Sequence, residues 1–586
     1  MLPLSRIPTS ITGQTWCWRG AANGEDAHAD DLVAQLLLAR GCAREDLAIH
    51  RAPTLRHFMP DPSLFQDMDV AASRLADAVE ANETVTIYGD YDVDGATSAA
   101  LLIRLLRALG QEPGYYIPDR LMEGYGPSGA ALVKLAQGGS SLIVTVDCGA
   151  QAFEALAMAR AEGVDVIVVD HHQCATALPP ALALVNPNRL DECTEGAAHG
   201  HLAAVGVAFL LAAALVRELR SRGYFTARAE PPLLDLLDLV ALGTVADVAQ
   251  LRGLNRAFVA QGLKVMAGRR NLGLATLAAV SRLTRAPLCH DLGFALGPRI
   301  NAGGRVGKSD LGVRLLTTED EEEARAIAQE LDRLNEERRA IESIVQEDAA
   351  QMAEHQGNRS VLLVSGDGWH PGVIGIVAGR LKEKFGRPAI VIATDETGTG
   401  KGSGRSISGV DLGAAVLAAK ESGLLAAGGG HAMAAGLTVN SDSIGHLHDF
   451  LDERLAADVA RASAERVLVV DSLLSPRGVN PRIVAEMEAA GPFGVGWPAP
   501  RIATGPLRIV KADTVGSGGH VRLILSGQDG ASLKAVGFRQ AETPLGQALL
   551  GASRGRSLWL AGRAKIDEWG GGKSAELHID DAAWAD

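Results

Sequence analysis

Three apolar stretches in the first third of the chain each end in an aspartate. VTIYGD ends at Asp90, LIVTVD at Asp147 and VIVVD at Asp170. Short apolar runs with helical patterns between them predict buried strands of a parallel sheet. Because the carboxyl ends of parallel strands meet at one rim, where open α/β folds bind ligands, the three acids are expected to converge there. Carboxylates this close repel one another unless cations lie between them, so the sequence predicts a metal site.

The length and composition are those of a globular enzyme with several domains. At 586 residues the chain is expected to divide into about three or four domains. Hydrophobic residues make up 47% and charged residues 22%, which is ordinary for a folded protein. The formal net charge of −14 argues mildly against a protein that coats nucleic acid, although basic residues can still line one groove.

The beginning of the chain and its cysteines favour a cytoplasmic protein. MLPLSRIPTS lacks the basic start and apolar core of a secretory signal. The longest apolar stretch, 202–216, is shorter than the ~20 residues that a bilayer span requires. Six scattered cysteines without CxxC spacing favour reduced thiols over a disulfide framework or a zinc site. We expect no membrane association.

The pattern of strands and helices predicts five segments. Helices near 71–81, 96–109, 127–137 and 150–162 alternate with apolar strands, which indicates parallel βαβ units. An acidic, capped start at 317–321 opens a long helix that reaches about residue 353. The expected segments are an amino-terminal extension with one helix at 31–40 (1–60), an α/β domain with a parallel sheet (61–316), a connecting helix (317–356), a smaller α/β domain (357–458) and a small β-barrel (459–586).

The segment DYDVDG at 90–95 holds the densest group of acids. Its carboxylates at alternate positions suit a hard divalent cation, and Gly95 allows a helix to begin close to the site. The same letters resemble the start of a calcium-binding EF-hand loop. That loop requires a bidentate glutamate at position 101, which is Leu101 here. Taken alone, Asp147 can also be interpreted as the N-cap of a helix.

The adjacent histidines His171 and His172 follow Asp170 and strengthen the metal interpretation. Neighbouring side chains after a strand point in different directions, so one imidazole can bind metal while the other reaches a phosphate or a leaving oxygen. A lone Asp-His-His would more often be structural. A mixed set of carboxylates and imidazoles favours Mn²⁺ over Ca²⁺, whose ligands are nearly all oxygen atoms.

Several motifs together resemble a known group of enzymes. The acids of DYDVDG, Asp147, the DHH of 170–172 and ALGTVAD at 241–247 are similar to the four motifs of the DHH phosphoesterase superfamily. WHPGVIGIVAGR at 369–380, GSGRS at 402–406 and GGGHAMAAG at 428–436 resemble its companion DHHA1 domain. LGPRINAGGR at 296–305, LNEERR at 334–339 and GPFGVG at 491–496 resemble the RecJ family of single-strand-specific 5′→3′ DNA exonucleases. The resemblance covers about residues 50–586.

The resemblance implies the fold, the reaction and the site. It implies a DHH domain, a DHHA1 domain and an OB-fold-like barrel, with two-metal hydrolysis of single-stranded DNA to 5′-mononucleotides in recombination and repair. The ions would be Mn²⁺ or Mg²⁺, with Asp147 bridging two of them. The implied metal ligands are Asp92, Asp94, Asp147, His171 and Asp247. Asp90 and His172 would complete the catalytic set, and Tyr88 stands where related pyrophosphatases have a histidine.

The second group of motifs implies residues that bind nucleic acid and partners that deliver it. A glycine-rich loop can expose backbone N–H groups to phosphate, although such a loop is more often only a turn. The implied binding residues are Arg299, Asn301, Arg305, His370, Arg380, Arg405, Ser406, Gly429, Gly430 and His431. An arginine beside Gly303 and Gly304 can also brace the domain, and His370 can be structural. In the barrel, Phe493, Trp497 and Phe538 can stack on bases or lie in the core. Expected partners are single-strand binding protein and a RecQ-like helicase.

The sequence leaves two other hypotheses about the function open. The same catalytic motifs occur in enzymes that resemble oligoribonucleotide and cyclic-dinucleotide phosphodiesterases and in pyrophosphatases, which tend to be shorter or to carry membrane and sensory segments. A non-catalytic DNA-binding relative is the other alternative. Such a protein is expected to have lost acids from the motifs, whereas all are present in this chain.

Overall fold

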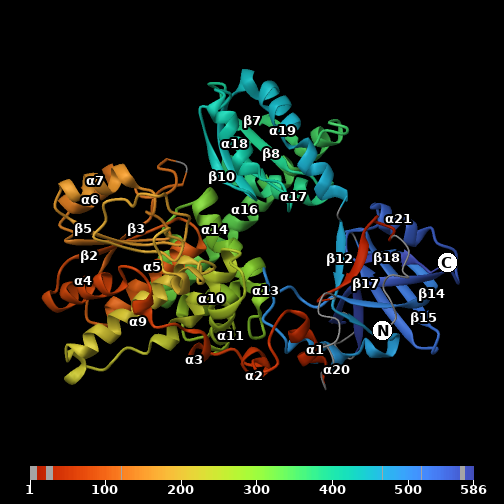
Figure 1. Cartoon of the computed structure of the whole chain (residues 1–586), viewed down its shortest axis with the longest axis horizontal. Coiled ribbons are helices and arrows are strands. Elements are labelled where there is room, and N and C mark those ends of the chain that lie inside the picture. Colours follow the sequence, from red (N-terminus) through yellow and green to blue (C-terminus); the bar gives the residue numbers. More distant parts are fainter. Residues whose placement is uncertain are drawn as a thin grey trace. The chain divides into compact units, whose positions relative to one another are not determined.

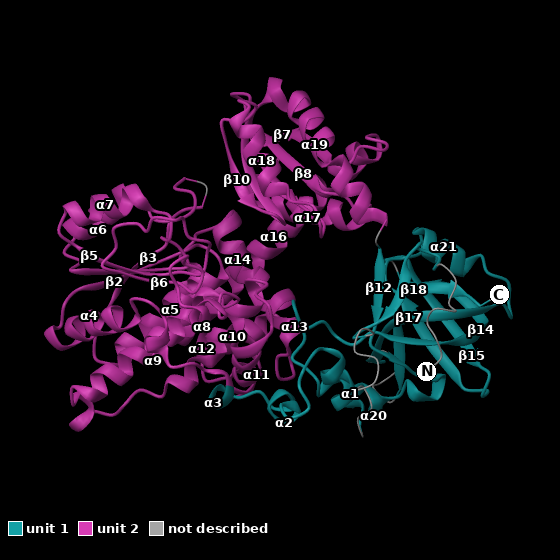
Figure 2. Cartoon of the chain, in the orientation of Figure 1, with its two compact units in different colours: residues 1–57, 466–586 teal, residues 58–465 magenta. Residues whose placement is uncertain are grey.

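A computed structural model describes residues 10–20, 31–120, 122–464, 466–516, 518–567 and 574–585. The chain divides into two compact units, coloured separately in Figure 2. One unit comprises residues 58–465, and the other combines residues 1–57 with residues 466–586. Parts of the expected extension, residues 1–9 and 21–30, lie outside the described residues.

The first unit contains the predicted parallel sheet. Its strand order is β3-β2-β4-β5-β6, and every neighbouring pair is parallel. The register pairs Gly89 with Val146 and Val146 with Val169, so the next residue of each strand, an aspartate, lies at the same rim. The strands are β2 (Val85–Gly89), β3 (Gly114–Tyr116), β4 (Leu142–Val146), β5 (Asp165–Val169) and β6 (Ala183–Val185). The predicted fold class is confirmed for this domain.

Helices cover both faces of this sheet, as Figure 1 shows. α6 and α7 pack together on one face, where Leu132 and Leu156 join the core with Ile143 of the sheet. α4, α5 and α9 lie on the other face, where α9 contacts both α4 and α5. Their bounds are α4 (Met68–Ala81), α5 (Val93–Ala108), α6 (Gly129–Gln137), α7 (Phe153–Ala161) and α9 (Ala204–Ser221). The four expected crossover helices are thus present, with ends shifted by a few residues.

A helical segment follows and leads to the second lobe. It begins with a 3-10 turn at Leu233–Leu236, which follows two prolines. The chain then forms α10 (Leu237–Ala246), α11 (Gly253–Ala267), α12 (Leu272–Val280), α13 (Cys289–Asp291), the π-helix η6 (Leu292–Leu296), α14 (Gly297–Val306) and α15 (Leu311–Thr317). The apolar helix α10 is buried along most of its length.

The long helix α16 (Glu321–Glu354) connects the two lobes of this unit. It begins where Asp320 accepts a hydrogen bond from the Glu323 amide, so the acidic first turn also faces the positive end of the helix dipole. It packs on α12 and α14 in one lobe and on α17 in the other. Its 34 residues agree with the predicted long helix.

The second lobe is a smaller α/β domain with a mixed sheet in the order β10-β11-β9-β8-β7. Only β7 and β8 are parallel, and the other neighbouring pairs are antiparallel. The elements are β7 (Leu362–Asp367), α17 (Pro371–Phe385), β8 (Ala389–Thr394), β9 (Thr399–Arg405), α18 (Leu412–Glu421), β10 (Ala427–His431), β11 (Ala434–Asn440) and α19 (Ile444–Ala464). β10 is therefore an edge strand.

The other unit is built around a closed β-barrel. β14 pairs with β15 on one side and with β17 on the other, which closes the ring β14-β15-β16-β18-β17. Its strands are β14 (Ile502–Val515), β15 (His520–Gly527), β16 (Ser532–Gly537), β17 (Ser557–Ile566) and β18 (Ala575–Trp584), with helices α20 (Pro481–Glu488) and α21 (Pro544–Leu550). This confirms the predicted carboxyl-terminal barrel.

The amino-terminal segment completes the barrel unit through a strand that the sequence analysis did not predict. β1 (Thr15–Trp18) pairs in parallel with β12 (Val467–Val470). Trp16 is buried, and its Nε1 donates a hydrogen bond to Asp581 Oδ2 at 2.9 Å. The helix expected at 31–40 is α1 (Leu32–Ala39), capped by Asp31. Among the described residues, no helix combines the length and the apolar character needed to cross a membrane.

Replacing Trp16 with phenylalanine should lower the free energy of unfolding of the barrel unit by about 1–3 kcal/mol, because the buried Asp581 carboxylate loses a donor. Urea unfolding followed by circular dichroism measures the change. Trp18→Phe is the matched control, since Trp18 packs against the same core cluster and its indole makes no hydrogen bond among the described residues. Equal effects of the two changes would contradict the role given to the Trp16–Asp581 bond.

Candidate metal centre

Three aspartates follow β2, β4 and β5 and lie buried at the rim of the parallel sheet. Asp90, Asp147 and Asp170 are each at most 3% exposed. Asp147 adopts a left-handed backbone, with φ 61°, and its amide donates to Val169 O of the neighbouring strand. A left-handed conformation is uncommon for a residue other than glycine, and such residues concentrate at functional sites.

The first turn of α5 fixes two more acids. Asp92 caps the helix, and its Oδ1 accepts hydrogen bonds from the amides of Asp94 (2.8 Å) and Gly95 (3.1 Å). A Cβ atom on Gly95 would lie 2.5 Å from Asp90 O, so only glycine allows the helix to start this close. The Asp94 carboxylate accepts hydrogen bonds from the amides of Ala204 and Val205 at the start of α9.

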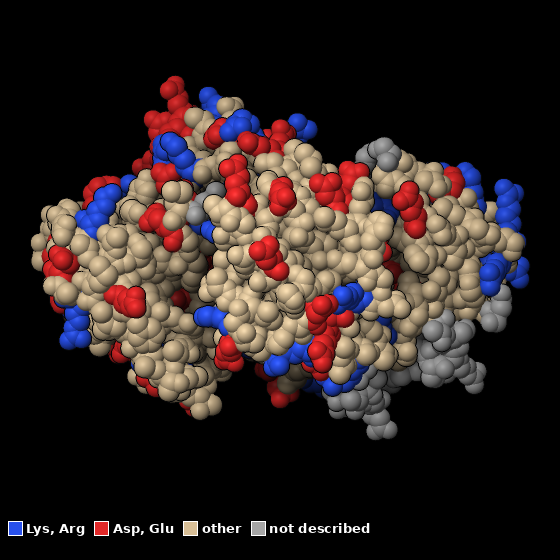
Figure 3. Space-filling model, turned by 90° about the horizontal axis from the view of Figure 1, so that it is seen from above, with Lys and Arg blue, Asp and Glu red and all other residues tan. Residues whose placement is uncertain are grey.

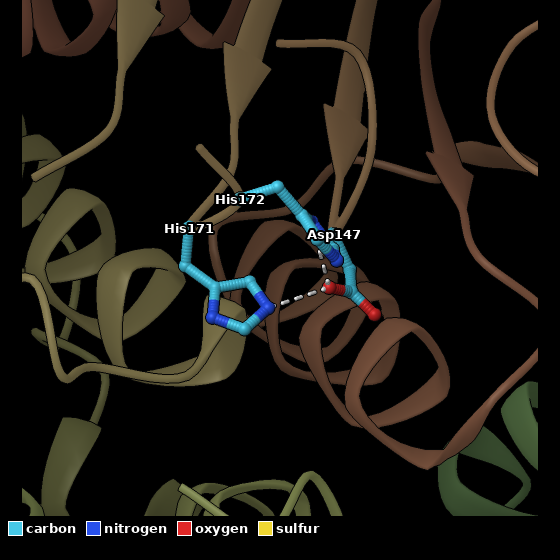
Figure 4. A group of neighbouring side chains, drawn as sticks. All are labelled: Asp147, His171 and His172. Carbon is cyan, nitrogen blue, oxygen red and sulfur yellow. Dashed lines mark ion pairs between the residues drawn. The ribbon is translucent and has the colours of Figure 1, made fainter. Parts of the chain in front are cut away.

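The two histidines face the Asp147 carboxylate, as Figure 4 shows. His171 Nδ1 lies 3.1 Å from Leu202 O, and because a carbonyl only accepts, this nitrogen carries the proton. The lone pair of His171 is then on Nε2, which lies 3.3 Å from Asp147 Oδ1 and 3.9 Å from Asp94 Oδ2. Asp247, just after α10, completes this side, with its Oδ2 3.9 Å from His171 Nδ1.

Asp170 holds both histidines in place. Its carboxylate accepts hydrogen bonds from the amides of Ala150, His171 and His172 and lies 2.7 Å from His172 Nδ1. The Tyr125 hydroxyl lies 2.9 Å from the same nitrogen and donates to Asp147 O at 3.1 Å. The orientation of His172 is therefore set from two sides.

The geometry suits divalent ions. Ligand atoms lie within 4.8 Å of one another in three overlapping groups: Asp94, His171 and Asp247; Asp147, His171 and His172; and Asp90, Asp92 and Asp147. Asp90 Oδ1, Asp147 Oδ1 and His171 Nε2 are buried without a hydrogen-bond partner among the described residues. Buried polar atoms are otherwise nearly always paired, so these three atoms fit positions that await a cation.

The electrostatics of the acids agree with this interpretation. Burial, followed by the nearby Asp92, raises the pKa of Asp94 to about 7 and the pKa of Asp90 well above its usual range. Burial, followed by the same neighbour, also raises the pKa of Asp147, and burial followed by Asp94 raises the pKa of Asp247 to about 9. The protein alone supplies too little positive charge near these carboxylates to keep them ionised. A bound cation would provide that charge.

The pKa values of the two histidines are shifted in opposite directions. Burial, with a further contribution from His172, lowers the pKa of His171 to about 4, so this imidazole stays neutral and able to bind metal. Burial also disfavours the charged form of His172, but the bond to Asp170 outweighs it and raises the pKa of His172. Burial disfavours the charged form of Asp170 too, but the same bond outweighs it and lowers the pKa of Asp170 to about 2.

A basic pocket of about 510 Å³ lies in the same unit, between elements of its two lobes. Five of its lining residues are cations: Arg120, Arg305, Arg380, Lys401 and Arg405. Burial, followed by the nearby Arg120, lowers the pKa of Arg305 to about 10 and also lowers the pKa of Arg405. Desolvated guanidinium groups gathered around one pocket point to an anionic ligand.

Three of the ten residues predicted to bind nucleic acid line this pocket, namely Arg305, Arg380 and Arg405. Arg305 also donates to Gly372 O across the lobes. Arg299 instead pairs with Asp332 of α16 at 2.8 Å, the contact of a residue that braces α14. Asn301 lies on the same helix, one turn before Arg305.

The other predicted binding residues have structural contacts of their own. His370 caps α17, where its Nδ1 accepts from the Gly372 amide at 3.0 Å. The buried Ser406 hydroxyl donates to Val410 O. Gly429, Gly430 and His431 lie on the edge strand β10. Gly430 has a φ of +151°, and a Cβ atom there would lie 2.3 Å from Ala434 O, so the backbone of this strand requires glycine.

Several residues of the site were not predicted. Tyr125 and Arg120 lie in the segment between β3 and α6, which has no periodic pattern. Asp170 was predicted at the rim of the sheet and in the DHH motif, but its hydrogen bonds to the two histidines were not predicted. Tyr88, at the position of the missing histidine, is buried, and its hydroxyl donates to Gly126 O.

The barrel presents one of the three aromatic candidates to solvent. Trp497 is only 7% exposed and Phe493 is half-buried against the core. Phe538 is 46% exposed, and its ring contacts His520 and His578 edge-on.

On the face seen in Figure 3, the coloured basic and acidic side chains are interspersed and form no continuous basic stripe among the described residues.

Comparison with known proteins identifies the domains. Residues 84–244 match the model of the DHH family, N-terminal domain, residues 358–457 match the DHHA1 domain, and residues 470–581 match the RecJ OB domain. The solved structure of RecJ from Thermus thermophilus in complex with Mn²⁺ is similar, with a TM-score of 0.78 at 29% identity, over 94% of this chain and 76% of that one. The Mg²⁺ complex of RecJ from the same organism gives a TM-score of 0.72 at 27% identity, over 94% and 74%.

Two curated relatives extend the similarity to the sequence. The single-stranded-DNA-specific exonuclease RecJ of Bacillus subtilis is 36% identical over 563 residues, which cover 95% of this chain and 69% of the relative. The protein of that name from Dickeya dadantii is 38% identical, over 89% of this chain and 91% of the relative. Similarity at this level across most of both chains means that the chain belongs to the RecJ family of single-stranded-DNA-specific exonucleases.

Proposed function

We propose that this protein hydrolyses the phosphodiester bonds of single-stranded DNA from the 5′ end and releases 5′-mononucleotides, in DNA recombination and repair. The observation that carries the proposal is the group of buried carboxylates with raised pKa values around unpaired ligand atoms. Membership of the RecJ family supplies the substrate class. The 5′→3′ direction rests on the motifs of the sequence.

Asp92, Asp94, Asp147, His171 and Asp247 would hold the ions, Mn²⁺ or Mg²⁺. A bound pair would neutralise phosphate charge, lower the pKa of a water molecule and stabilise the leaving 3′-oxygen. The protein's part is to hold neutral His171 with its Nε2 lone pair toward Asp147 and to fix Asp94 through two amides. His172, kept in place by Asp170 and Tyr125, is in position to contact the scissile phosphate or the leaving group.

The basic pocket would bind phosphates of the strand. Arg305, Arg380 and Arg405 lie there with Arg120 and Lys401, and guanidinium groups match phosphate geometry. The other predicted contacts, Arg299, Asn301, His370, Ser406 and the Gly429–His431 edge, would contribute by bracing these cations or by presenting backbone groups. The barrel would add a second site for single-stranded DNA, where the exposed Phe538 can stack on a base.

We propose two further points about the setting of the protein. All six cysteines are free thiols in the structure, which supports a reducing cytoplasm. A nuclease limited to single-stranded DNA depends on a supply of single strands, and the family resemblance suggests single-strand binding protein and a RecQ-like helicase as its partners. Co-purification of each with the full chain tests these assignments.

A panel of substrates tests the function against its alternatives. With Mn²⁺, we expect 5′-labelled single-stranded DNA to be consumed first, and duplex DNA, short oligoribonucleotides and a cyclic dinucleotide much more slowly. Faster loss of the oligoribonucleotides or the cyclic dinucleotide would favour the other DHH phosphodiesterases. Binding of DNA without hydrolysis would favour the non-catalytic relative.

Asp147→Asn tests the metal centre. Asparagine tolerates the left-handed backbone, so the fold should be kept while one charge is lost. We expect hydrolysis of single-stranded DNA to fall by about 10²- to 10³-fold, because the loss of one group that stabilises charge in the transition state has effects of this size. When a chelator has removed the metal, the melting temperature of the variant should be no lower than that of the parent, because the substitution reduces the repulsion between buried carboxylates. Added Mn²⁺ should raise the melting temperature of the parent by the larger amount.

Asp165→Asn is the matched control for that experiment. Asp165 begins β5, at the opposite end of the strand from Asp170, and pairs with Arg74. The Asp165→Asn variant should hydrolyse DNA as the parent does and show the same rise in melting temperature with Mn²⁺. If Asp147→Asn hydrolysed single-stranded DNA at the rate of the parent, the assignment of Asp147 as a catalytic metal ligand would be refuted.

Phe538→Ala tests the barrel. We expect the affinity for a long oligothymidylate to fall about tenfold through the loss of one stacked base, with little change in the cleavage of a very short strand. Fluorescence anisotropy in chelator measures the affinity. Val510→Ala, which removes another exposed apolar side chain of the barrel, should have no effect. An unchanged affinity in Phe538→Ala would exclude stacking at this position.

A further inference from the structure

We propose that Phe294, stacked on His290, is a platform on which one base of the DNA strand stacks beside the metal centre. The inference rests on the proposed function and adds a subsite for a nucleobase. Phe294 lies in η6 and is 67% exposed. Its ring centroid lies 4.4 Å from that of His290, with an interplanar angle of 20°.

The exposure of this ring is unusual in this chain. Aromatic residues make up only 4% of the sequence, and of its eleven phenylalanines, all of them among the described residues, only Phe294 and Phe538 are exposed. His290 covers one face of the Phe294 ring in a nearly parallel stack. A second flat ring can therefore continue the stack on the other face, which is the geometry that aromatic side chains offer to bases.

The position of Phe294 ties the platform to the metal centre. A Cβ atom built on Gly293 would lie 3.5 Å from Val245 Cγ1, and one on Gly297 would lie 3.3 Å from Ala246 Cβ. Both neighbours belong to the last turn of α10, and the next residue is Asp247. The π-helix thus packs directly on the turn that delivers one of the proposed metal ligands, and π-helical turns are frequent at functional sites.

The chemistry of the surroundings selects a base as the occupant. On this proposal, a strand whose scissile phosphate lies at the Asp247 side of the centre passes over the adjacent surface, where its unpaired bases are exposed either to water or to an aromatic ring. The exposed side chains of Leu288 and Val248, close to Phe294 and Asp247 in the chain, add apolar area to this surface. Stacking on an aromatic ring is tolerant of base identity, which agrees with an exonuclease that must accept every nucleotide in turn.

The test is a double-mutant cycle in which Phe294 is changed in the protein and one base is removed from the DNA strand. Oligothymidylates carry a single abasic residue at successive positions from the 5′ end, and KM is measured with Mn²⁺ for the parent, Phe294→Ala and Phe294→Trp. In the parent, the abasic residue should raise KM about tenfold at the position that meets the platform. Phe294→Ala should have a raised KM on the intact strand and show no further rise at that position. Phe294→Trp should behave like the parent.

The comparison of strands within each variant is insensitive to the fraction of folded enzyme, because that fraction is the same for both strands. Leu234→Ala removes another exposed apolar side chain of the same unit and should show the parent's abasic profile. Additive effects of Phe294→Ala and the abasic residue at every position would overturn the inference alone. A parent that leaves the intact strand uncut would overturn the proposed function, and the platform with it.

Discussion

Repulsion between carboxylates at the rim of a parallel sheet is the constraint on which this structure depends. The sheet brings Asp90 and Asp147 together in a buried place, and α5 adds Asp92 and Asp94. No sheet benefits from such an arrangement by itself, because burial and like charge both oppose ionisation. The arrangement becomes favourable when divalent cations occupy the space between the acids, so the site couples the stability of this unit to metal binding.

The histidine pair shows how two identical neighbours can acquire different properties. The pKa of His171 is lowered by burial, and this imidazole keeps a free lone pair because its other nitrogen is tied to a backbone carbonyl. His172, one residue later, lies against the Asp170 carboxylate and retains a proton more readily. Asp170 is therefore an acid that serves the site without joining the group of ligands. Its four hydrogen bonds leave it little capacity for a metal.

The features that could be predicted from the sequence are those determined by local pattern. A strand that ends in an acid, or a glycine required beside Asp90, leaves its signal within a few residues, so the parallel sheet, the start of α5 and the long helix α16 were recognisable. The basic pocket was only partly predictable, because Arg120, Arg305 and Arg405 meet through tertiary packing. The roles of Tyr125 and Asp170 depend on side-chain directions that no spacing encodes. The exposure of Phe294 and Phe538 likewise follows from the packing around them.

The pairing of β1 with β12 has a consequence for how the protein is made. β1 can pair with β12 only after residues 58–465, the whole metal-binding unit, have been synthesised. Domains generally fold as units during synthesis, so the catalytic part can be complete while the amino-terminal segment still waits with an unsatisfied backbone edge. The backbone edge of β1 is thus open to mispairing until β12 has been synthesised and can pair with it.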